Sequence, residues 1–328
     1  MSKVATVALA LGFVFVAFSG QCYGASPPLK VGFYQGKCNG TVDVEVIVGG
    51  VVKTWFSSDS TITPALLRMQ FHDCFVTGCD ASLLLDGSNS EKTAVPNLSV
   101  RGYGLIDAAK AAVEAICPGV VSCADIISMA TRDAVSLSGG GRYIVHTGRR
   151  DGTVSLAKNV NLPAPSISVS NSINAFSKKG LSVVDMVYLL GGHTVGVAHC
   201  SFFQDRLYNF QNSGQPDNTM SPSLLFFLRM RCPQNATIDN TANLDQNPLS
   251  SSIVDNSYYQ QIMLHRGVLQ IDQELAQDPS TRDMVTAIAK GVDFSTKFGQ
   301  AMIKLGAVQV LTGTQGQIRK SCRAVNTI

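Results

Sequence analysis

The 328-residue sequence has few charges and few aromatic rings: charged residues make up 15% of the chain, aromatic residues 7%, and the single tryptophan is Trp55. Lys and Arg number 26 against 23 Asp and Glu and form no basic blocks, so the electrostatic pattern of a nucleic-acid-binding protein is missing. After residue 25 the chain has no further apolar run of about 18 residues, the length that spans a membrane. It also lacks a Gly-x-Ser-x-Gly motif, which counts against a serine hydrolase.

The N-terminus has the segment order of a secretory signal peptide. Lys3 precedes an apolar run from Val4 to Phe18, and small residues follow around Gly20. The run is short for a membrane span, so a membrane anchor is the weaker alternative. We predict a signal peptide over residues 1–24 and one secreted domain over 25–328, delivered to the cell exterior or cell wall and free of the membrane after cleavage.

Nine cysteines are unusual for a cytosolic enzyme of this size. Signal cleavage removes Cys22 and leaves eight, and an even number in an oxidising compartment predicts four disulfides. Spacing favours only one particular pair, Cys74 with Cys79, which requires a tight turn between them. Export also fits the three sequons, which begin at Asn39, Asn97 and Asn235.

Apolar spacing and helix-start signals predict one mostly helical domain with few short strands. Thr63 is the expected N-cap of the helix that runs to Cys74. Ser122 with Asp125, and Ser182 with Asp185, have the spacing of capping boxes. The expected helices cover residues 42–56, 63–74, 105–116, 122–138, 182–190, 221–230, 280–290 and 294–309.

The first candidate site is the segment Arg68-Met-Gln-Phe-His72. Arg68 and His72 are four residues apart on a predicted helix, so their side chains share one face. A cation beside an imidazole lowers its pKa and keeps it neutral, as a general base requires. Taken alone, the pair could also be two solvated polar residues on an exposed face.

Oxygen ligands follow directly. Asp73, Asp80 and Ser82, with carbonyl groups of the intervening turn, supply hard donors that fit calcium rather than a transition metal, although the spacing is not that of an EF-hand. A zinc site built from His72, Cys74 and Cys79 is the weaker alternative. An exported chain favours the disulfide, and no fourth zinc ligand is apparent.

The second candidate site is the segment Leu190-Gly-Gly-His193-Thr194. A histidine that follows a helix-ending glycine pair is, by itself, most simply a C-terminal cap. A metal-bound imidazole, however, needs a carboxylate or carbonyl on its other nitrogen, and Asp272 could supply one. Spacing alone does not show that His193 and Asp272 meet.

Together these segments resemble the secreted haem peroxidases of plants, class III. The match runs from Phe33-Tyr34 to Cys322, nearly the whole mature chain. The further motifs that carry it are Glu91-Lys92 with Asn97, Val121-Ser-Cys-Ala-Asp125, Gly148-Arg-Arg-Asp151, Leu162-Pro-Ala-Pro165, Asp255-Asn with Tyr258-Tyr259, and Leu311-Thr-Gly-Thr-Gln-Gly-Gln-Ile-Arg319. The resemblance implies a mainly α fold in which two helical lobes sandwich one haem b.

The resemblance also implies a role for each site residue. His193 would be the axial iron ligand, supported by Asp272. The residues implied on the peroxide side are Arg68 and His72 with the relay of Asn97 and Glu91, while Phe71 and Phe202 would lie beside the cofactor and Pro163 beside the substrate. The implied disulfides are Cys38–Cys117, Cys74–Cys79, Cys123–Cys322 and Cys200–Cys232. If Asn97 serves a buried relay, its sequon should carry no glycan.

Two calcium ions are implied in the same way. The distal ion would be held by Asp73, Val76, Gly78, Asp80 and Ser82. The proximal ion would be held by Thr194, Asp245, Ser250, Ile253 and Asp255. The proximal segment departs from the family pattern, because two residues are added and the usual threonine is replaced by Ser250.

The resulting hypothesis is a monomeric peroxidase that reduces hydrogen peroxide and oxidises small phenolic donors, such as lignin precursors, in one-electron steps. Ser166 and Ile167 stand where the family frequently has aromatic rings, so we expect a wide and less selective donor entrance. The alternative is a secreted calcium-binding structural protein that has lost haem. Such a protein would be expected to lack at least one of Arg68, His72 and His193, and all three are present.

Overall fold

The computed structural model describes residues 28–38, 40 and 42–327, so the predicted signal peptide and Asn39 lie outside the described residues. Four helices form the first half of the described chain: α1 (Val44–Ser58), α2 (Ile62–Val76), α3 (Tyr103–Ile116) and α4 (Cys123–Leu137). The later helices are α5 (Val169–Lys178), α6 (Val183–Leu190), α7 (Gln204–Tyr208), α8 (Pro222–Arg231), α9 (Ser257–Met263), α10 (Gln270–Leu275), α11 (Arg282–Lys290) and α12 (Phe294–Leu305). The mainly α fold predicted from the sequence is confirmed.

Strand structure is sparse in the described part of the chain. Strands β1 (Val197–His199) and β2 (Thr241–Asn243) form one antiparallel pair, with Ala198 opposite Ala242. Within these residues no helix is both long and apolar enough to cross a lipid bilayer.

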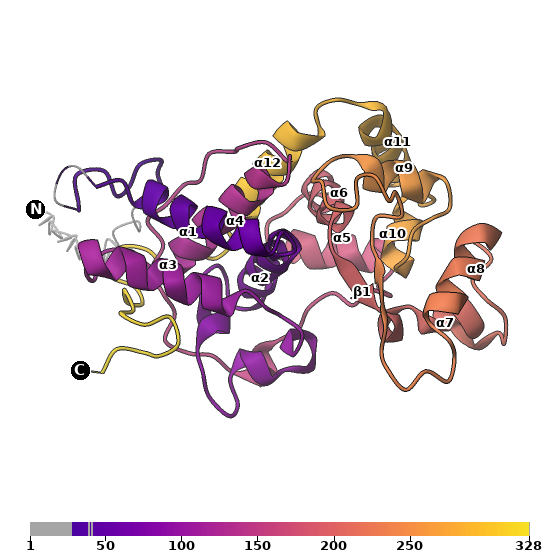
Figure 1. The fold of residues 1–328 in the computed structure, drawn as a ribbon, viewed down its shortest axis with the longest axis horizontal. Helices are drawn as coiled ribbons and strands as arrows, with labels where there is room; N and C mark the ends of the chain where they lie inside the picture. Colours follow the sequence, from indigo (N-terminus) through magenta and orange to yellow (C-terminus); the bar gives the residue numbers. More distant parts are fainter. Residues whose placement is uncertain (1–27, 39, 41, 328) are drawn as a thin grey trace, which may run out of the picture.

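Two hydrophobic cores divide the molecule into two helical lobes (Figure 1). Helices α1 to α4 surround the first core, and α5 to α12 surround the second. Helix α2 contributes to both, because Leu66 and Met69 belong to the first core whereas Leu67 and Phe75 belong to the second. The helix that carries the first candidate site therefore lies at the boundary between the lobes.

The two predicted capping boxes turn out differently. At α6, Ser182 and Asp185 exchange both expected hydrogen bonds. At α4, the Ser122 hydroxyl accepts a hydrogen bond from the Asp125 amide, but the Asp125 carboxylate instead pairs with the Arg149 guanidinium at 2.6 Å. The prediction of a complete box at Ser122 is wrong. Leaving the buried Arg149 guanidinium without a charged partner would cost more free energy than the second capping hydrogen bond would contribute.

Helix α2 starts two residues earlier than predicted, and its N-cap is Thr61 and not Thr63. The Thr63 hydroxyl donates instead to the Ala134 carbonyl of α4 at 3.1 Å. Helix α12 ends at Leu305 and not at residue 309, and α1 runs unbroken through Gly49-Gly50. These differences arise where tertiary contacts between helices outweigh the local signals.

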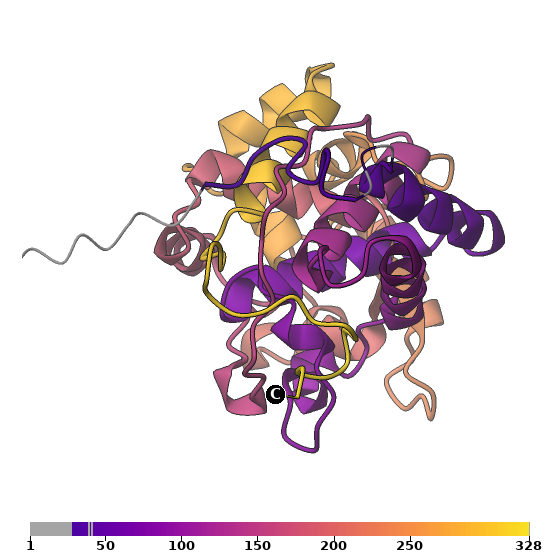
Figure 2. The same ribbon diagram turned by 90° about the vertical axis from the view of Figure 1, so that its left-hand side faces the viewer.

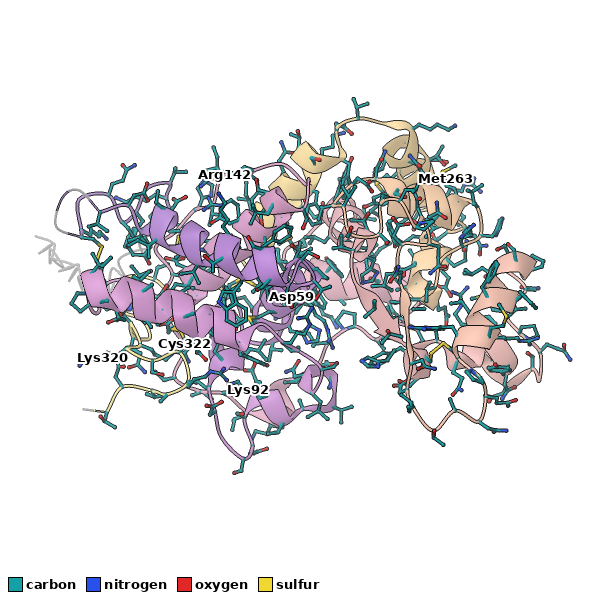
Figure 3. The ribbon with its side chains drawn as sticks, viewed as in Figure 1. Asp59, Lys92, Arg142, Met263, Lys320 and Cys322 are labelled. Atoms are coloured by element: carbon teal, nitrogen blue, oxygen red, sulfur yellow. A yellow bond between two sulfur atoms is a disulfide. The ribbon has the colours of Figure 1, made fainter. Side chains whose placement is uncertain are left out.

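All eight cysteines of the predicted secreted domain are paired, as the resemblance implied. The bonds are Cys38–Cys117, Cys74–Cys79, Cys123–Cys322 and Cys200–Cys232. Because Cys74 and Cys79 bind each other, the zinc alternative is wrong. The bond at Cys322 ties the C-terminal segment to α4, and this segment crosses the face of the first lobe (Figures 2 and 3).

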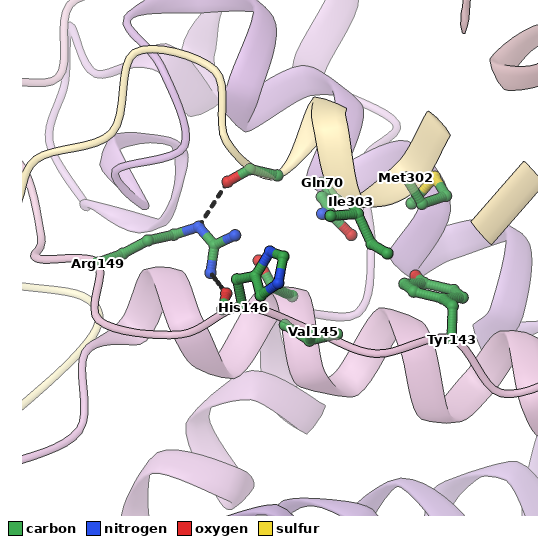
Figure 4. A pocket seen from close by; sticks show the side chains of 9 residues that line it. Gln70, Tyr143, Val145, His146, Arg149, Met302 and Ile303 are labelled. Atoms are coloured by element: carbon green, nitrogen blue, oxygen red, sulfur yellow. Dashed lines mark hydrogen bonds between the residues drawn. The ribbon is translucent and has the colours of Figure 1, made fainter. Parts of the chain in front are cut away.

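A cavity of about 10 Å³ is enclosed by α2, α4, α12 and the segment 143–149 (Figure 4). Two of the residues that line it, Gln70 and Tyr143, each have a buried side-chain oxygen without a hydrogen-bond partner among the described residues. On the opposite wall, Arg149 donates to the Gly306 carbonyl at 2.7 Å. The volume is near the lower limit for holding one water molecule.

Candidate active site

Arg68 and His72 meet on the face of α2. The Arg68 Nε donates to His72 Nε2 at 3.2 Å, and the other guanidinium nitrogens donate to the Ser99 hydroxyl at 3.0 Å and the Pro96 carbonyl at 2.8 Å. His72 is only 6% exposed, so the alternative of a solvated pair is wrong. Burial and the adjacent guanidinium lower the pKa of His72 to about 4. The imidazole is therefore neutral at physiological pH and carries its lone pair on Nε2.

Asn97 fixes the tautomer of His72. Since Nε2 accepts from Arg68, the ring proton lies on Nδ1, which donates to Asn97 Oδ1 at 2.6 Å. The Asn97 amide donates in turn to the main-chain carbonyl of Glu91 at 2.7 Å. The relay predicted through Glu91 thus uses its backbone. The Glu91 carboxylate is fully buried, has no hydrogen-bond partner among the described residues, and has its pKa raised by burial to about 7.

His193 lies in a single 3₁₀ turn, Gly191–Thr194, directly after α6. Its Nδ1 lies 2.7 Å from Asp272 Oδ1 on α10, so the simple helix-cap interpretation is wrong. Burial alone would lower the pKa of His193, but the Asp272 carboxylate outweighs this effect and raises it. The Nε2 atom has no hydrogen-bond partner among the described residues, and 29% of the side chain remains accessible.

Two neighbours hold this arrangement. The Tyr258 hydroxyl of α9 donates to the same Asp272 oxygen at 2.9 Å. Gly191 lets the turn pass close to α9, because a Cβ at this position would lie 2.3 Å from the Tyr259 hydroxyl oxygen. Sequence reasoning noted Tyr258 only as part of a motif. The signal that could have revealed its role is that a buried tyrosine hydroxyl requires a partner.

The distal oxygen ligands come together beyond the end of α2. Asp73 accepts from the Ala81 amide at 3.0 Å, and Asp80 accepts from the Ser82 amide at 3.0 Å. Burial raises the pKa values of both carboxyl groups, and in Asp73 the neighbouring carboxylates add to the effect. Gly78 has φ 111°, and a Cβ there would lie 2.3 Å from the Gln309 carbonyl oxygen. This turn therefore packs two buried carboxylates together in a way that favours a cation.

Two contacts at the distal cluster were not foreseen. The Lys179 ammonium donates to the Val76 carbonyl at 3.0 Å, so this predicted ligand already has a partner. Arg319 of the C-terminal segment donates to the Ala81 carbonyl at 2.7 Å. Both contacts fix the turn between Val76 and Ala81 through residues that are distant in the sequence. No local sequence pattern predicts them.

The proximal oxygen ligands also converge. Thr194, directly after His193, donates to Asp255 Oδ1 at 3.1 Å and lies 3.4 Å from the Ile253 carbonyl. The Ser250 hydroxyl donates to Asp245 at 3.1 Å. Burial raises the pKa of Asp245, and the nearby Asp255 carboxylate adds to this effect. The two-residue insertion therefore does not separate the predicted set.

Both clusters have the same donor chemistry. In the part of the chain that the structure describes, no three or more His, Cys, Asp and Glu side chains are grouped as a metal site. Each cluster instead combines two carboxylates with hydroxyl and carbonyl oxygens. Such a set suits a hard cation such as calcium and not zinc.

The aromatic residues predicted beside the cofactor differ in burial. Phe71 is half-buried and packs on Phe75, with ring centroids 4.6 Å apart. Phe202 is 43% exposed and borders a surface groove that also includes Ser166. Pro163 is half-buried and does not line this groove.

Ile167 also lies away from the groove. It packs against the core of the second lobe, and the width of the donor entrance stays a prediction. Of the two replaced aromatic positions, only Ser166 lines the groove.

Comparisons with known proteins agree with this fold and site. A family model described as Peroxidase matches residues 48–291. The chain is 52% identical over 326 residues to Peroxidase 60 of Arabidopsis thaliana, which covers 98% of this chain and 97% of that protein. It is 50% identical over 320 residues to Peroxidase 57 of the same plant, covering 97% of each chain. It is 44% identical over 303 residues to Peroxidase N1 of Nicotiana tabacum, covering 90% of each.

The fold, the site and these relatives together define an oxidoreductase of the peroxidase type. The chain belongs to the plant class III peroxidase family, as its sequence motifs predicted, and none of the comparisons favours the haem-less alternative.

Proposed function

We propose that this peroxidase is secreted as a monomer, binds one haem b and two calcium ions, and uses hydrogen peroxide to oxidise small phenolic donors. The observation that carries the proposal is the contrast between two histidines. His72 is neutral, with Nε2 facing Arg68. His193 has a carboxylate on Nδ1, and its Nε2 has no hydrogen-bond partner within the described part of the chain. One is suited to move a proton and the other to bind a metal.

The residues around His193 fit a haem group. A neutral imidazole whose second nitrogen is held by a carboxylate would bind the haem iron strongly, and here Asp272 is itself oriented by Tyr258. The accessible part of the His193 side chain gives its Nε2 room to coordinate iron. When bound, the haem supplies the redox chemistry of the reaction. Phe71 and Phe202 would provide apolar contacts to it.

His72 and Arg68 would act on the peroxide. His72 Nε2 takes one proton from hydrogen peroxide and returns it to the departing oxygen, while Asn97 holds the Nδ1 proton in place. The Arg68 guanidinium stabilises the negative charge that develops when the O–O bond breaks. In the whole reaction, one hydrogen peroxide and two phenols give two waters and two phenoxyl radicals.

The two oxygen clusters would each hold one calcium ion. The proposed distal ligands are Asp73, Val76, Gly78, Asp80 and Ser82, and the proposed proximal ligands are Thr194, Asp245, Ser250, Ile253 and Asp255. A divalent cation would offset the repulsion that raises the pKa values of Asp73 and Asp245. Each ion would lie beside a functional histidine, because Asp73 follows His72 and Thr194 follows His193.

Secretion is supported by the four disulfides, which persist in oxidising compartments. The sequon at Asn235 is exposed, whereas Asn97 is 2% exposed and hydrogen-bonded to His72. A glycan at Asn97 would have no room, so we expect glycosylation at Asn39 and Asn235 and not at Asn97.

An absorption spectrum of the purified protein tests the proposal. We expect a Soret band that shifts on addition of hydrogen peroxide. The variant His193→Ala should keep its helical circular dichroism and lose the band. A correctly folded native protein that takes up no haem, or a His193→Ala variant with full Soret absorbance, would overturn the assignment.

A further inference from the structure

A surface groove of about 660 Å³ lies beside α7. Its inner end is formed by Ser166 and Phe202, and it extends along α7 to Asn212 and to Gln234, which follows α8. The groove falls within the range of about 300–1,000 Å³ typical of ligand sites for molecules larger than a single ring. Pro165, which lines the groove, accepts a hydrogen bond at 3.2 Å from the amide of Ile271, which precedes Asp272. The groove thus adjoins the segment that supports His193.

The groove wall combines apolar surface with several uncharged polar groups. The side chains of Ser166, Asp205, Asn212 and Gln234 make no hydrogen bond to other described residues. Asn209 uses its carbonyl oxygen for the Gly214 amide at 2.7 Å, which leaves its NH₂ group available. Among the residues that the structure describes, no lysine or arginine lines the groove, and Asp205 is its only formal charge. The wall therefore presents amide and hydroxyl groups together with one carboxylate.

This combination matches a neutral sugar. Hydroxyl groups both donate and accept, and amide and carboxylate side chains offer both functions at short spacing. The Phe202 ring, 43% exposed, gives an apolar face against which the C–H groups of a sugar or a phenol ring can pack. An anionic sugar is disfavoured, because Asp205 would repel its carboxylate and no cation lines the groove.

We propose that the groove binds the neutral sugar portion of a phenolic glycoside, with the phenol ring directed toward Phe202. This inference rests on the proposed function, since the phenol is the electron donor. The groove would select donors by what is attached to the ring and not by the ring itself. The chain's own glycan at Asn235, next to Gln234, is the competing occupant.

The test compares three donors with the same para-alkoxyphenol ring. The holoenzyme is assayed with 4-methoxyphenol, 4-hydroxyphenyl β-D-glucoside and 4-hydroxyphenyl β-D-glucuronide. Two or more hydrogen bonds to the sugar should lower the KM of the glucoside relative to 4-methoxyphenol on the order of tenfold. The glucuronide should lose this advantage, and kcat should be similar for all three donors.

Variants locate the effect. Asn212→Ala combined with Gln234→Ala should remove the glucoside advantage and leave the kinetics with 4-methoxyphenol unchanged. Asn218→Ala, which removes an exposed amide outside the groove, is the matched control and should change neither donor. Equal KM values for glucoside and 4-methoxyphenol, or an advantage that survives the double variant, would overturn the proposal.

Two further measurements separate the remaining outcomes. If the glucoside advantage appears only after Asn235→Gln, the groove holds the chain's own glycan and the proposal of a donor site is overturned. Binding of methyl β-D-glucoside, measured by NMR chemical-shift changes at the amides of Asn209 and Asn212 in the holoprotein, requires no turnover. Failure to oxidise 4-methoxyphenol would contradict the proposed function, whereas absent sugar binding with normal oxidation of 4-methoxyphenol would contradict only this inference.

Discussion

At the scale of single residues, the two functional histidines differ in what their Nδ1 atoms contact. His72 faces a neutral amide, Asn97, and has the Arg68 cation on its other side, which together with burial lowers its pKa to about 4. His193 faces the Asp272 carboxylate, and its pKa is raised. The same side chain thus has the properties of a proton acceptor at one position and those of an electron-rich metal ligand at the other.

The first prediction concerns the pH dependence of peroxide activation. His72 must be unprotonated to accept a proton, so the rate of the peroxide step should be constant above pH 5 and fall as the pH drops through about 4. Asn97→Asp places a carboxylate beside Nδ1, which raises the pKa of His72 and should move this fall to higher pH. Stopped-flow mixing with hydrogen peroxide measures both profiles.

His72→Ala supplies the reference and should slow the peroxide step by at least about 10²-fold. A pH profile that is identical in the native protein and in Asn97→Asp would count against the assigned roles.

The second prediction compares two buried tyrosines. Tyr258→Phe removes a hydrogen bond to the Asp272 carboxylate and should lower the free energy of unfolding by about 1.5–3 kcal/mol. Tyr143→Phe removes a buried hydroxyl that has no partner among the described residues, so it should be neutral or slightly stabilising. Denaturant unfolding of the two variants is the measurement. Equal destabilisation by both changes would mean that the two hydroxyls are equally well satisfied.

At the scale of elements, α2 links catalysis to the distal oxygen cluster. It carries Arg68 and His72 on one face, continues into Asp73, and ends where the Cys74–Cys79 bond closes the turn. The 3₁₀ turn after α6 does the same for the proximal cluster, since His193 and Thr194 are consecutive. A shift of either cluster would therefore move a functional histidine.

The third prediction is that the two proposed calcium ions leave in order. The distal turn is held by the Cys74–Cys79 bond and by Arg319, whereas the proximal loop contains the inserted residues and exposes Leu249 to 87%. Titration with a chelator should release the proximal ion first and lower activity and thermal stability together. Atomic emission measures the calcium content, and Asp245→Asn should remove the early step only. Two ions released at one chelator concentration would contradict the prediction.

At the scale of the whole molecule, the C-terminal segment returns to the first lobe and ties it together. Cys322 binds Cys123 at the start of α4, and Arg319 reaches the carbonyl of Ala81 in the distal turn. The chain therefore begins and ends its described part on the same lobe, while the second lobe is formed by the residues between (Figures 1 and 2).

The fourth prediction separates two disulfides by the loop that each closes. Cys123–Cys322 spans 199 residues and Cys74–Cys79 spans 5. Loop-closure entropy predicts a stabilisation of about 5 kcal/mol for the first bond and about 2 kcal/mol for the second. Replacing each pair with alanine and measuring guanidinium unfolding tests this order. The 74–79 variant should lose distal calcium more easily despite its smaller loss of stability, and the reverse order in stability would contradict the prediction.

The sequence by itself determined the features that depend on residues close together in the chain. Arg68 and His72 share a face because helix geometry places positions i and i+4 side by side, and Ser182 caps α6 with Asp185 because both lie in one turn. The family motifs further predicted the peroxidase class and the cysteine pairs. These inferences needed no knowledge of packing.

Only the tertiary structure decided which distant groups meet. His193 and Asp272 form a hydrogen bond although they are 79 positions apart. The Asp125 carboxylate binds Arg149 and does not complete the capping box at Ser122. The Thr63 hydroxyl donates to the Ala134 carbonyl of α4 and does not cap α2. The groove beside Phe202 likewise gathers side chains from separate segments. The physical reason is that a buried polar group forms its hydrogen bond with whichever group the packing places beside it. The free-energy cost of leaving that group unpaired exceeds the small differences in free energy that local capping and helix propensity contribute.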